Sequence, residues 1–322
     1  MGRCPTISGN VFKGQGRSRP RCQFINNRDA LEGRLRIAVP NKGRLRAPAL
    51  RLLEDSGIGP IYDPGSRSLV TPTNMDDVYI VYVRAEDIPG VVAAGAADLG
   101  ITGHDLVVES DAKVDELLDL GFGRARLVLA VPEGSGISSI SDLRPGMRVA
   151  TKFVRIAGEF FRGLGLDVEI VRISGAAEVM PMLGAADAIV DVTSTGTTLA
   201  LHGLKPIHTI MESSARLIGG PSRAARRELA DRVVESVRSV IMAKRRKLLL
   251  MNVPDESLSD VLSVLPAMSG PMVAKVQSSS PMWEVMAAVP AEEIPRLIVE
   301  LRRRGARDLL AIDLERLMPR WT

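Results

Sequence analysis

The chain has 322 residues, more than one typical hydrophobic core organises, so we expect two or three domains. Hydrophobic residues make up 45% of the chain and aromatic residues only 3%, so aliphatic side chains must build the cores. Aromatic platforms for stacking single-stranded nucleic acid are therefore scarce. The formal net charge of +4 fits an enzyme of polyanionic substrates, and would equally fit weak nucleic-acid binding.

Much of the excess positive charge lies at the amino end, between Arg3 and Arg36. We expect residues 1–33, rich in Gly, Arg and Pro, to be a disordered extension, and we predict no nucleic-acid partner. Both cysteines, Cys4 and Cys22, lie in this segment, and the sequence contains no Cys/His spacing typical of a zinc site. The sequence also lacks an apolar run long enough for a secretory signal or a membrane span, so we predict a cytoplasmic chain without a membrane partner.

The next part of the chain alternates short apolar runs with helical periodicity. Arg36–Pro40 is an apolar run that ends in a turn, and Ala47–Ser56 has helical spacing that Gly57 terminates. Tyr79–Val83 has the pattern of a buried strand, and Asp87–Pro89 opens a helix with proline in its first turn. This alternation predicts α/β layers around a largely parallel sheet.

An internal repeat indicates two similar lobes. Gly95-Ala-Ala-Asp98 and Gly184-Ala-Ala-Asp187 each follow a helical pattern and enter a strand that ends at a hydroxyl- and glycine-bearing turn. Chance similarity is the alternative, because small residues commonly mark tight packing of a helix on a strand. We expect the chain to cross between the lobes near Gly121–Arg126 and to return near Lys205–Met211. Ligands of open α/β sheets bind at the carboxyl ends of strands, where both turns lie.

The last part of the chain has a different pattern. Ala224–Leu250 is an amphipathic helical stretch that ends in the cations Lys244–Lys247, which complement the helix dipole without any nucleic acid. The remainder predicts a ferredoxin-like order of strand, helix, strand, strand, helix and strand. The expected bounds are, in that order, 248–253, 255–265, 272–276, 283–289, 292–304 and 309–314.

One segment combines acidic and hydroxyl chemistry: Asp187-Ala-Ile-Val-Asp191-Val-Thr193-Ser194-Thr195-Gly196-Thr197-Thr198-Leu199. Backbone N–H groups and threonine hydroxyls in such a turn suit a sugar phosphate, and glycine allows the backbone to approach it closely. Asp191, at the mouth of the turn, is placed to accept hydrogen bonds from ribose hydroxyls. The alternative, equal to the first without further context, is a Ser/Thr-rich turn that only caps a helix.

The wider run 178–199 resembles the signature of the ATP phosphoribosyltransferases. Val39–Leu45 and the stretch from Val83 to Gly103 are similar to the same family, and the resemblance covers the chain from about Arg34 onward. It implies a two-lobed, periplasmic-binding-protein-like (type II) α/β unit and a C-terminal ferredoxin-like (ACT-like) regulatory domain. It also implies Mg²⁺-dependent transfer of phosphoribosyl from 5-phosphoribosyl 1-pyrophosphate to ATP, inhibition by histidine, and homo-oligomers, namely dimers and hexamers.

The resemblance assigns expected roles to residues, with Asp191 and Arg44 as the catalytic pair. Asp187 is expected either to contact the ribose or to serve packing or capping at the far end of its strand. For Arg84 and Asp98, the alternative to a nucleotide contact is an ion pair within the lobe. The direct Mg²⁺ ligands are not predicted. The phosphoribosyl pyrophosphate site is expected to comprise Asp187, Asp191, Thr193, Ser194, Thr195, Gly196, Thr197 and Thr198; the nucleotide site Lys42, Arg44, Arg84, Asp98 and Lys152; and the histidine site Asn252, Met268, Ser269, Gly270, Met272 and Asp308.

The predicted organisation follows from these features. After the extension, residues 34–122 and 206–225 form the first lobe, residues 123–205 the second, and residues 226–322 the linker helix and regulatory domain. A two-lobed ligand-binding module, either a transport receptor or the effector part of a transcription regulator, is the rival hypothesis. Neither rival gives a reason for an aspartate to precede a threonine-rich phosphate turn.

Overall fold

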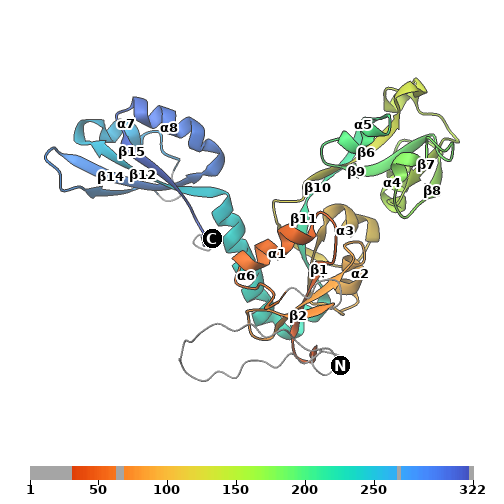
Figure 1. Ribbon diagram of the computed structural model, residues 1–322, viewed down its shortest axis with the longest axis horizontal. Helices are drawn as coiled ribbons and strands as arrows, with labels where there is room; N and C mark the ends of the chain where they lie inside the picture. Colours follow the sequence, from red (N-terminus) through yellow and green to blue (C-terminus); the bar gives the residue numbers. More distant parts are fainter. Residues whose placement is uncertain (1–30, 63–68, 267–269, 319–322) are drawn as a thin grey trace, which may run out of the picture. The chain divides into compact units, whose positions relative to one another are not determined.

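The computed structural model describes residues 31–62, 69–266 and 270–318 (Figure 1). The chain divides into the units Met1–Glu32 and Gly33–Thr322. Apart from residues 31–33, the predicted extension lies outside the described residues. Three sheets organise the described part of the chain: one in each of two α/β lobes and one in a C-terminal domain.

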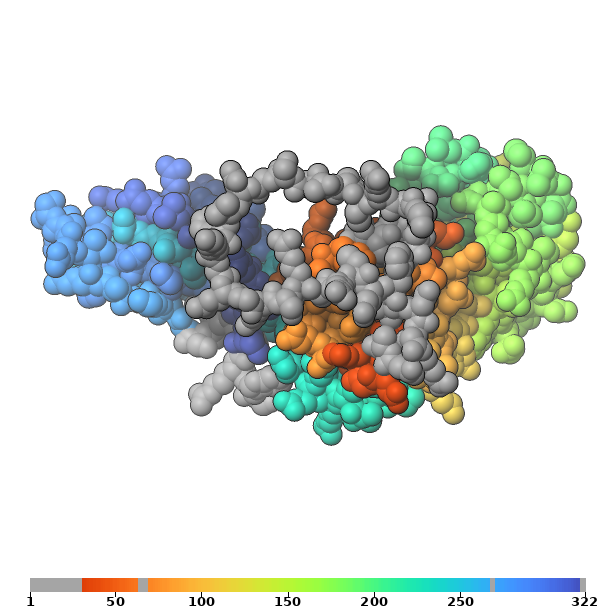
Figure 2. Space-filling view, turned by 60° about the horizontal axis from the view of Figure 1, so that its bottom comes forward, coloured from red at the N-terminus to blue at the C-terminus, as the bar shows by residue number. Residues whose placement is uncertain are grey.

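The first lobe is an α/β layer structure. Its elements are β1 (Leu35–Pro40), α1 (Arg46–Asp55), β2 (Val70–Pro72), β3 (Val78–Val83), α2 (Ile88–Ala93), β4 (Leu99–Gly103), α3 (His104–Ser110), β5 (Asp115–Asp119), β11 (Ala215–Gly219) and α6 (Arg227–Lys244). The sheet has the order β2-β3-β1-β4-β11-β5. One apolar cluster joins the sheet to α1 and α6, and a second joins it to α2 and α3, so both faces are covered. In Figure 2, α6 (turquoise) lies against the orange residues of this lobe.

The second lobe repeats this layering. Its elements are β6 (Ala125–Pro132), β7 (Arg148–Thr151), α4 (Val154–Gly163), β8 (Glu169–Arg172), β9 (Ala188–Thr193), α5 (Thr197–Leu201) and β10 (Leu204–Ser213). The sheet order is β10-β6-β9-β7-β8. Alternate residues of β6 enter opposite clusters: Leu127 and Leu129 pack with α4, whereas Val128 and Ala130 pack with α5.

The two lobes share one strand topology. In each, three parallel strands lie in the order second, first, third: β3-β1-β4 in the first lobe and β8-β7-β9 in the second. Next to the third strand lies an antiparallel strand that enters from the other lobe, β11 in the first lobe and β6 in the second. The fourth strand of each lobe, β5 or β10, pairs with that strand at the edge of the sheet. The predicted pair of periplasmic-binding-protein-like α/β lobes is thereby confirmed.

The Gly-Ala-Ala-Asp repeats occupy equivalent places in this topology. The carboxylate of Asp98 accepts a hydrogen bond of 2.8 Å from the backbone N–H of Arg36 in β1, and the Arg36 guanidinium donates to Gly95 O. In the second lobe, Asp187 accepts from the N–H of Arg148 at 2.8 Å, and the Arg148 guanidinium donates to Gly184 O. Each repeat therefore clamps the amino end of a third strand to the first strand beside it.

The two clamps differ in burial and in their partners. Asp98 is fully buried, and its second oxygen accepts a 3.0 Å hydrogen bond from Arg226, just before α6. The side chain of Asp187 is 41% exposed and forms its ion pair with Arg148. The first clamp therefore also anchors the start of α6 to the sheet.

The C-terminal domain is ferredoxin-like, and its predicted element order is confirmed. Its antiparallel sheet has the order β13-β14-β12-β15. Buried side chains of the sheet pack with those of α7 and α8 on one face. The elements are β12 (Arg246–Pro254), α7 (Leu258–Leu262), β13 (Met272–Lys275), β14 (Met282–Pro290), α8 (Ile294–Arg303) and β15 (Arg307–Asp313).

The structure corrects two predicted boundaries. The chain returns to the first lobe at Ser214, later than Lys205–Met211, because β10 pairs with β6 in the second sheet and only β11 joins the first. The predicted helix 224–250 ends at Lys244, because residues from Arg246 onward pair with β14. Sequence analysis also missed β5, a charged edge strand without an apolar run.

We predict that Asp98→Ala lowers the free energy of unfolding by about 3–5 kcal/mol, because it leaves Arg36 and Arg226 without their buried counter-charge. Asp187→Ala is the matched control, since it removes the equivalent clamp where solvent can replace the carboxylate. Denaturant unfolding of both variants measures the difference. An equal loss in the two variants would contradict the prediction.

Candidate functional site

Asp191 lies near the carboxyl end of β9, half-buried between β6 and β7. Its Oδ1 accepts a 2.7 Å hydrogen bond from the N–H of Val192. Burial raises the pKa of Asp191 above its ordinary value of 3.8, and the negative charges of Glu178 and Asp105 raise it further. The Val192 N–H and the charge of Lys152 act in the opposite direction. The fold therefore holds a partly desolvated carboxylate whose charge a cation would stabilise.

The turn after β9 is shaped by its own hydroxyls. Thr193 is buried, and its Oγ1 accepts a 2.9 Å hydrogen bond from the N–H of Gly196, which has φ +81°. Thr195 Oγ1 and Thr197 Oγ1 lie 3.0 Å apart. Thr193 therefore maintains the shape of the turn, whereas the side chains available to a ligand are the exposed ones, Ser194, Thr195, Thr197 and Thr198.

The helix that follows is too short to contribute much as a dipole. α5 spans five residues, and its N-cap residue, Gly196, has no side chain that could cap the helix. An anion at this turn would depend mainly on individual backbone N–H groups and hydroxyls, arranged as a small concave nest.

The structure separates the two other candidate aspartates from this turn. Asp187 precedes β9, four residues before Asp191, a separation of about 13 Å along a strand. Arg148 holds the pKa of Asp187 below its ordinary value through hydrogen bonds from its side chain and its N–H. Asp98 is likewise at the amino end of β4, fully buried. Of the two roles open to Asp187, this geometry favours structural anchoring, and it favours the same for Asp98 over the nucleotide contact.

The candidate cations of the first lobe follow the carboxyl ends of their strands, at the end of the sheet opposite to Asp98. The loop with Lys42 and Arg44 follows β1, and Arg84 follows β3, which pairs with β1 in parallel. The N–H of Asn41 donates to Val83 O at 2.8 Å, so the two loops are adjacent. All three cationic side chains are exposed, and Arg44 donates a 2.8 Å hydrogen bond to Gly123 O.

In the second lobe, Lys152 follows β7, directly beside the strand that carries Asp191. Its ammonium lies 5.0 Å from the centre of the Phe153 ring. Lys152 and Asp191 are close enough for the lysine charge to lower the pKa of the aspartate. The structure thus brings together an acid, a cation and a hydroxyl-bearing turn at one edge of this sheet.

Sequence analysis missed Asp105, a buried acid in the first turn of α3. Its Oδ1 accepts a 2.6 Å hydrogen bond from Ser213 Oγ, where the chain returns to the first lobe. The available signal was its place just after the strand of the first repeat, in Thr102-Gly-His-Asp105. Its negative charge contributes to the raised pKa of Asp191.

The predicted effector residues are only partly described. Asn252 in β12 donates a 3.0 Å hydrogen bond to Asp308 in β15, so two of them meet at the surface of the C-terminal domain. Gly270 has φ +104°, and Met272 is 62% exposed. Met268 and Ser269 lie outside the described residues.

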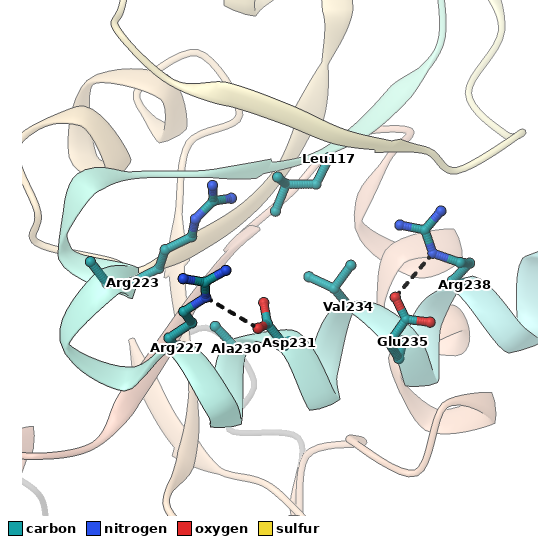
Figure 3. A pocket seen from close by; sticks show the side chains of 9 residues that line it. Leu117, Arg223, Arg227, Ala230, Asp231, Val234, Glu235 and Arg238 are labelled. Carbon is teal, nitrogen blue, oxygen red and sulfur yellow. Dashed lines mark hydrogen bonds and ion pairs between the residues drawn. The ribbon is translucent and has the colours of Figure 1, made fainter. Parts of the chain in front are cut away.

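Two surface pockets lie outside the site around Asp191. One, of about 750 Å³, lies between β5 and α6 and is lined by Leu117, Val234 and several charged side chains (Figure 3). Its arginines pair with carboxylates, as Arg227 does with Asp231. The other, of about 870 Å³, includes Arg148 and Asp187 at the amino end of β9. Neither pocket includes Asp191 or the turn.

The part of the chain that the structure describes forms no cage for a metal ion. Within residues 31–62, 69–266 and 270–318, no group of three or more His, Cys, Asp or Glu side chains could hold a metal ion. A magnesium ion commonly uses only one or two carboxylates together with substrate phosphates. Asp191 would supply one such carboxylate to a metal ion of that kind. No helix among the described residues is long and apolar enough to cross a membrane.

Comparisons with known proteins identify the family of the chain. Residues 84–239 match the family described as ATP phosphoribosyltransferase, and residues 243–316 match "HisG, C-terminal domain". The ATP phosphoribosyltransferase of Ignicoccus hospitalis is 53% identical over 290 residues, 88% of this chain and 100% of the relative. The chain belongs to the ATP phosphoribosyltransferase family.

Further relatives agree with this membership. The ATP phosphoribosyltransferase of Methanopyrus kandleri is 47% identical over 283 residues, 88% of this chain and 99% of that protein. A solved chain of the ATP phosphoribosyl transferase (HisG:HisZ) complex from Thermotoga maritima is 28% identical, with a TM-score of 0.57. The match covers 64% of this chain and 97% of that chain. The chain is thus a phosphoribosyltransferase, as the sequence predicts.

We predict opposite pH dependences for two substitutions in the segment that forms β9. The folded-state pKa of Asp191 is raised, so its contribution to stability is present below its ordinary pKa and is lost as pH rises through the folded value. Asp191→Asn should therefore be at least as stable as the parent at pH 7. Asp187 has a lowered pKa, so Asp187→Asn should be less stable at pH 7, and this difference should disappear as pH falls. Thermal unfolding between pH 3 and 8 measures both slopes; slopes of the same sign would contradict the assignment.

Proposed function

We propose that the chain transfers the phosphoribosyl group of 5-phosphoribosyl 1-pyrophosphate to N1 of ATP, the first step of histidine biosynthesis. The observation that carries the proposal is the partly desolvated Asp191 beside the exposed hydroxyls of the turn after β9. In the reaction, the bond from C1 of ribose to the pyrophosphate oxygen breaks, and its electron pair leaves with pyrophosphate. The N1 lone pair forms the new bond, so no strong base is needed.

Asp191 would hold the ribose hydroxyls and stabilise the positive charge that develops on the sugar. A preformed negative charge in a water-poor site stabilises such a transition state more effectively than a solvated one. The burial that raises the pKa of Asp191 also keeps its charge from being screened. Ser194, Thr195, Thr197 and Thr198 would receive the 5-phosphate, with Gly196 allowing close approach of the backbone.

The cations would serve the leaving group and the nucleotide phosphates. Lys42, Arg44 and Arg84 lie on adjacent loops of the first lobe, and Lys152 lies beside Asp191 in the second. Mg²⁺ would be carried mainly by pyrophosphate oxygens, with Asp191 as the carboxylate best placed to contribute, and would neutralise charge on the leaving group. Arg44, the other predicted catalytic residue, would contact that pyrophosphate.

Histidine would inhibit the enzyme by binding to the ferredoxin-like domain. The supporting observation is the exposed pair Asn252–Asp308, an amide and a carboxylate suited to a zwitterionic amino acid. The T. maritima relative is a complex of two kinds of chain, whereas this chain carries the C-terminal domain itself. We therefore expect homo-oligomers, dimers and hexamers, as the working form.

The direct test is to incubate the chain with ATP, 5-phosphoribosyl 1-pyrophosphate and Mg²⁺, and to follow phosphoribosyl-ATP by its ultraviolet absorbance. Product that depends on all three components supports the proposal. Absence of product in a folded preparation would contradict it.

We expect Asp191→Asn to lower kcat by about 10²-fold or more, because it removes the charge opposite the developing cation without changing the side-chain volume. Its fold, measured by circular dichroism, should match the parent. Asp187→Asn is the control, and its kcat should remain near that of the parent at a temperature where both are folded. Near-normal turnover by Asp191→Asn would exclude Asp191 from the mechanism.

Gly196→Val should raise KM for 5-phosphoribosyl 1-pyrophosphate more than KM for ATP, because the β-branched side chain blocks phosphate from the backbone. Gly196 has open space around the position of a Cβ, so the strain comes from its positive φ. Gly203→Val is the matched control, since Gly203 has φ +65° and equally open surroundings beyond the far end of α5. Steady-state kinetics with each substrate varied separates the two. Equal effects of Gly196→Val on both substrates would show that the turn is not a dedicated phosphate site.

A further inference from the structure

Helix α1 connects two distant features of the first lobe. Its amino end follows the Lys42–Arg44 loop, and the N–H of Arg46 donates to Gly43 O at 3.2 Å. Its ten residues extend about 15 Å to Asp55. A displacement of one end of such a short, regular helix therefore reaches the other end.

Both chain connections of the C-terminal domain meet the last turn of α1. Lys244, at the end of α6 just before β12, pairs with Asp55 at 2.6 Å. Arg316, three residues after β15, donates a 3.0 Å hydrogen bond to the backbone oxygen of Asp55. The adjacent N–H of Leu317 donates to Ser239 O in α6 at 3.0 Å. The segment 314–318 thus returns from the C-terminal domain to the catalytic lobe.

These contacts are of a kind that can be made and broken. The Lys244–Asp55 pair is exposed on both sides, 53% and 42%, so it contributes little to global stability. Arg316 places a cation on the negative end of the α1 dipole, a modest, salt-sensitive interaction. Contacts this weak serve poorly as a foundation for the fold, but they can bias two nearly equal arrangements.

A second series of contacts leads from the linker to the Lys42–Arg44 loop. Arg245, between α6 and β12, is close enough to Asp119 that its charge helps to lower the pKa of that carboxyl. Asp119 accepts hydrogen bonds from Ser214 Oγ and from the N–H of Gly121, where the chain crosses between lobes. Arg44 donates to Gly123 O two residues later. The linker to the C-terminal domain therefore faces the same crossing segment that anchors Arg44.

We propose that Arg316 and Asp55 are positioning residues, which transmit the arrangement of the C-terminal domain through α1 to the Lys42–Arg44 loop. The proposal deepens the proposed function, on which it rests, by assigning the contact through which an effector on the small domain reaches the catalytic lobe. Neither residue contacts substrate. Their effect is carried by the loop at the opposite end of the helix.

The experiment uses the full-length chain with Arg316→Ala, the charge-retaining Arg316→Lys, and Arg303→Ala as control. Arg303 is an exposed arginine in the last turn of α8. Hydrogen exchange followed by mass spectrometry, without effector, reports the protection of peptides that cover residues 41–55. Inhibition by histidine and direct calorimetric binding of histidine report the coupling.

We expect Arg316→Ala to accelerate exchange in residues 41–55 and to weaken histidine inhibition by about fivefold or more, the lower end of typical allosteric coupling. Direct histidine binding in the absence of substrates should stay within about twofold of the parent, because the effector pocket is untouched. Arg316→Lys should restore part of the protection, and Arg303→Ala should match the parent in both measurements.

The failures of the two proposals are distinguishable. Unchanged exchange in residues 41–45 of Arg316→Ala overturns the positioning role, whatever histidine does. If exchange changes in Arg316→Ala but histidine does not inhibit the parent chain, the effector part of the proposed function is wrong. The positioning role is then still supported. Parent-like inhibition of Arg316→Ala, where histidine does inhibit the parent, overturns the transmission path.

Discussion

The pairing of β9 with β6 and β7 fixes the register on which the candidate site depends, and hydrogen bonds between Arg148 and Asp187 join the amino end of β9 to β7. Strand residues alternate between two covered faces, so a shift of one residue would move Asp191 to the α4 side of the sheet. The backbone N–H of Arg148 and its guanidinium both bind Asp187, and its backbone O accepts from the N–H of Asp187. The clamp at one end of the strand thereby supports the register that the ladder with β6 and β7 sets for Asp191 at the other end.

The same device occurs in the first lobe with a different outcome. Asp98 is clamped by Arg36 in the equivalent register, but Arg226 adds a second, partly exposed cation and ties the start of α6 to the sheet. One lobe thus has the repeat at the start of the strand that carries Asp191, and the other uses it to anchor the helix that leads to the C-terminal domain. The shared strand topology makes both uses the result of one fold.

The surroundings of Asp191 make its charge costly to the fold. Its burial and its acidic neighbours raise its pKa, which means that the fold disfavours the charged form of this carboxylate. A substrate that brings a positive centre or a metal ion would supply the missing compensation. The destabilised carboxylate and the binding of the substrate are therefore two aspects of one electrostatic arrangement.

The sequence by itself determined the local elements and their classes. Strands β1, β3 and β9 and helices α1 and α6 follow from periodicity and from Gly and Pro signals, and the ferredoxin-like order follows from six short patterned segments. The turn after Asp191 and its resemblance to the family could be predicted because consecutive residues of the sequence define both. These features are local, so the residues that define them are close together in the chain.

Only the tertiary structure decided which partners each aspartate finds. Asp98 accepts a hydrogen bond from Arg36, 62 residues away in the sequence, and Asp187 accepts one from Arg148, 39 residues away. Asp105 accepts a hydrogen bond from Ser213, 108 residues away. The return of the chain at Ser214 depends on β10 pairing with β6, and the contact of Arg316 with Asp55 joins residues 261 apart. Such pairings are set by sheet order and side-chain packing, which a linear pattern does not specify.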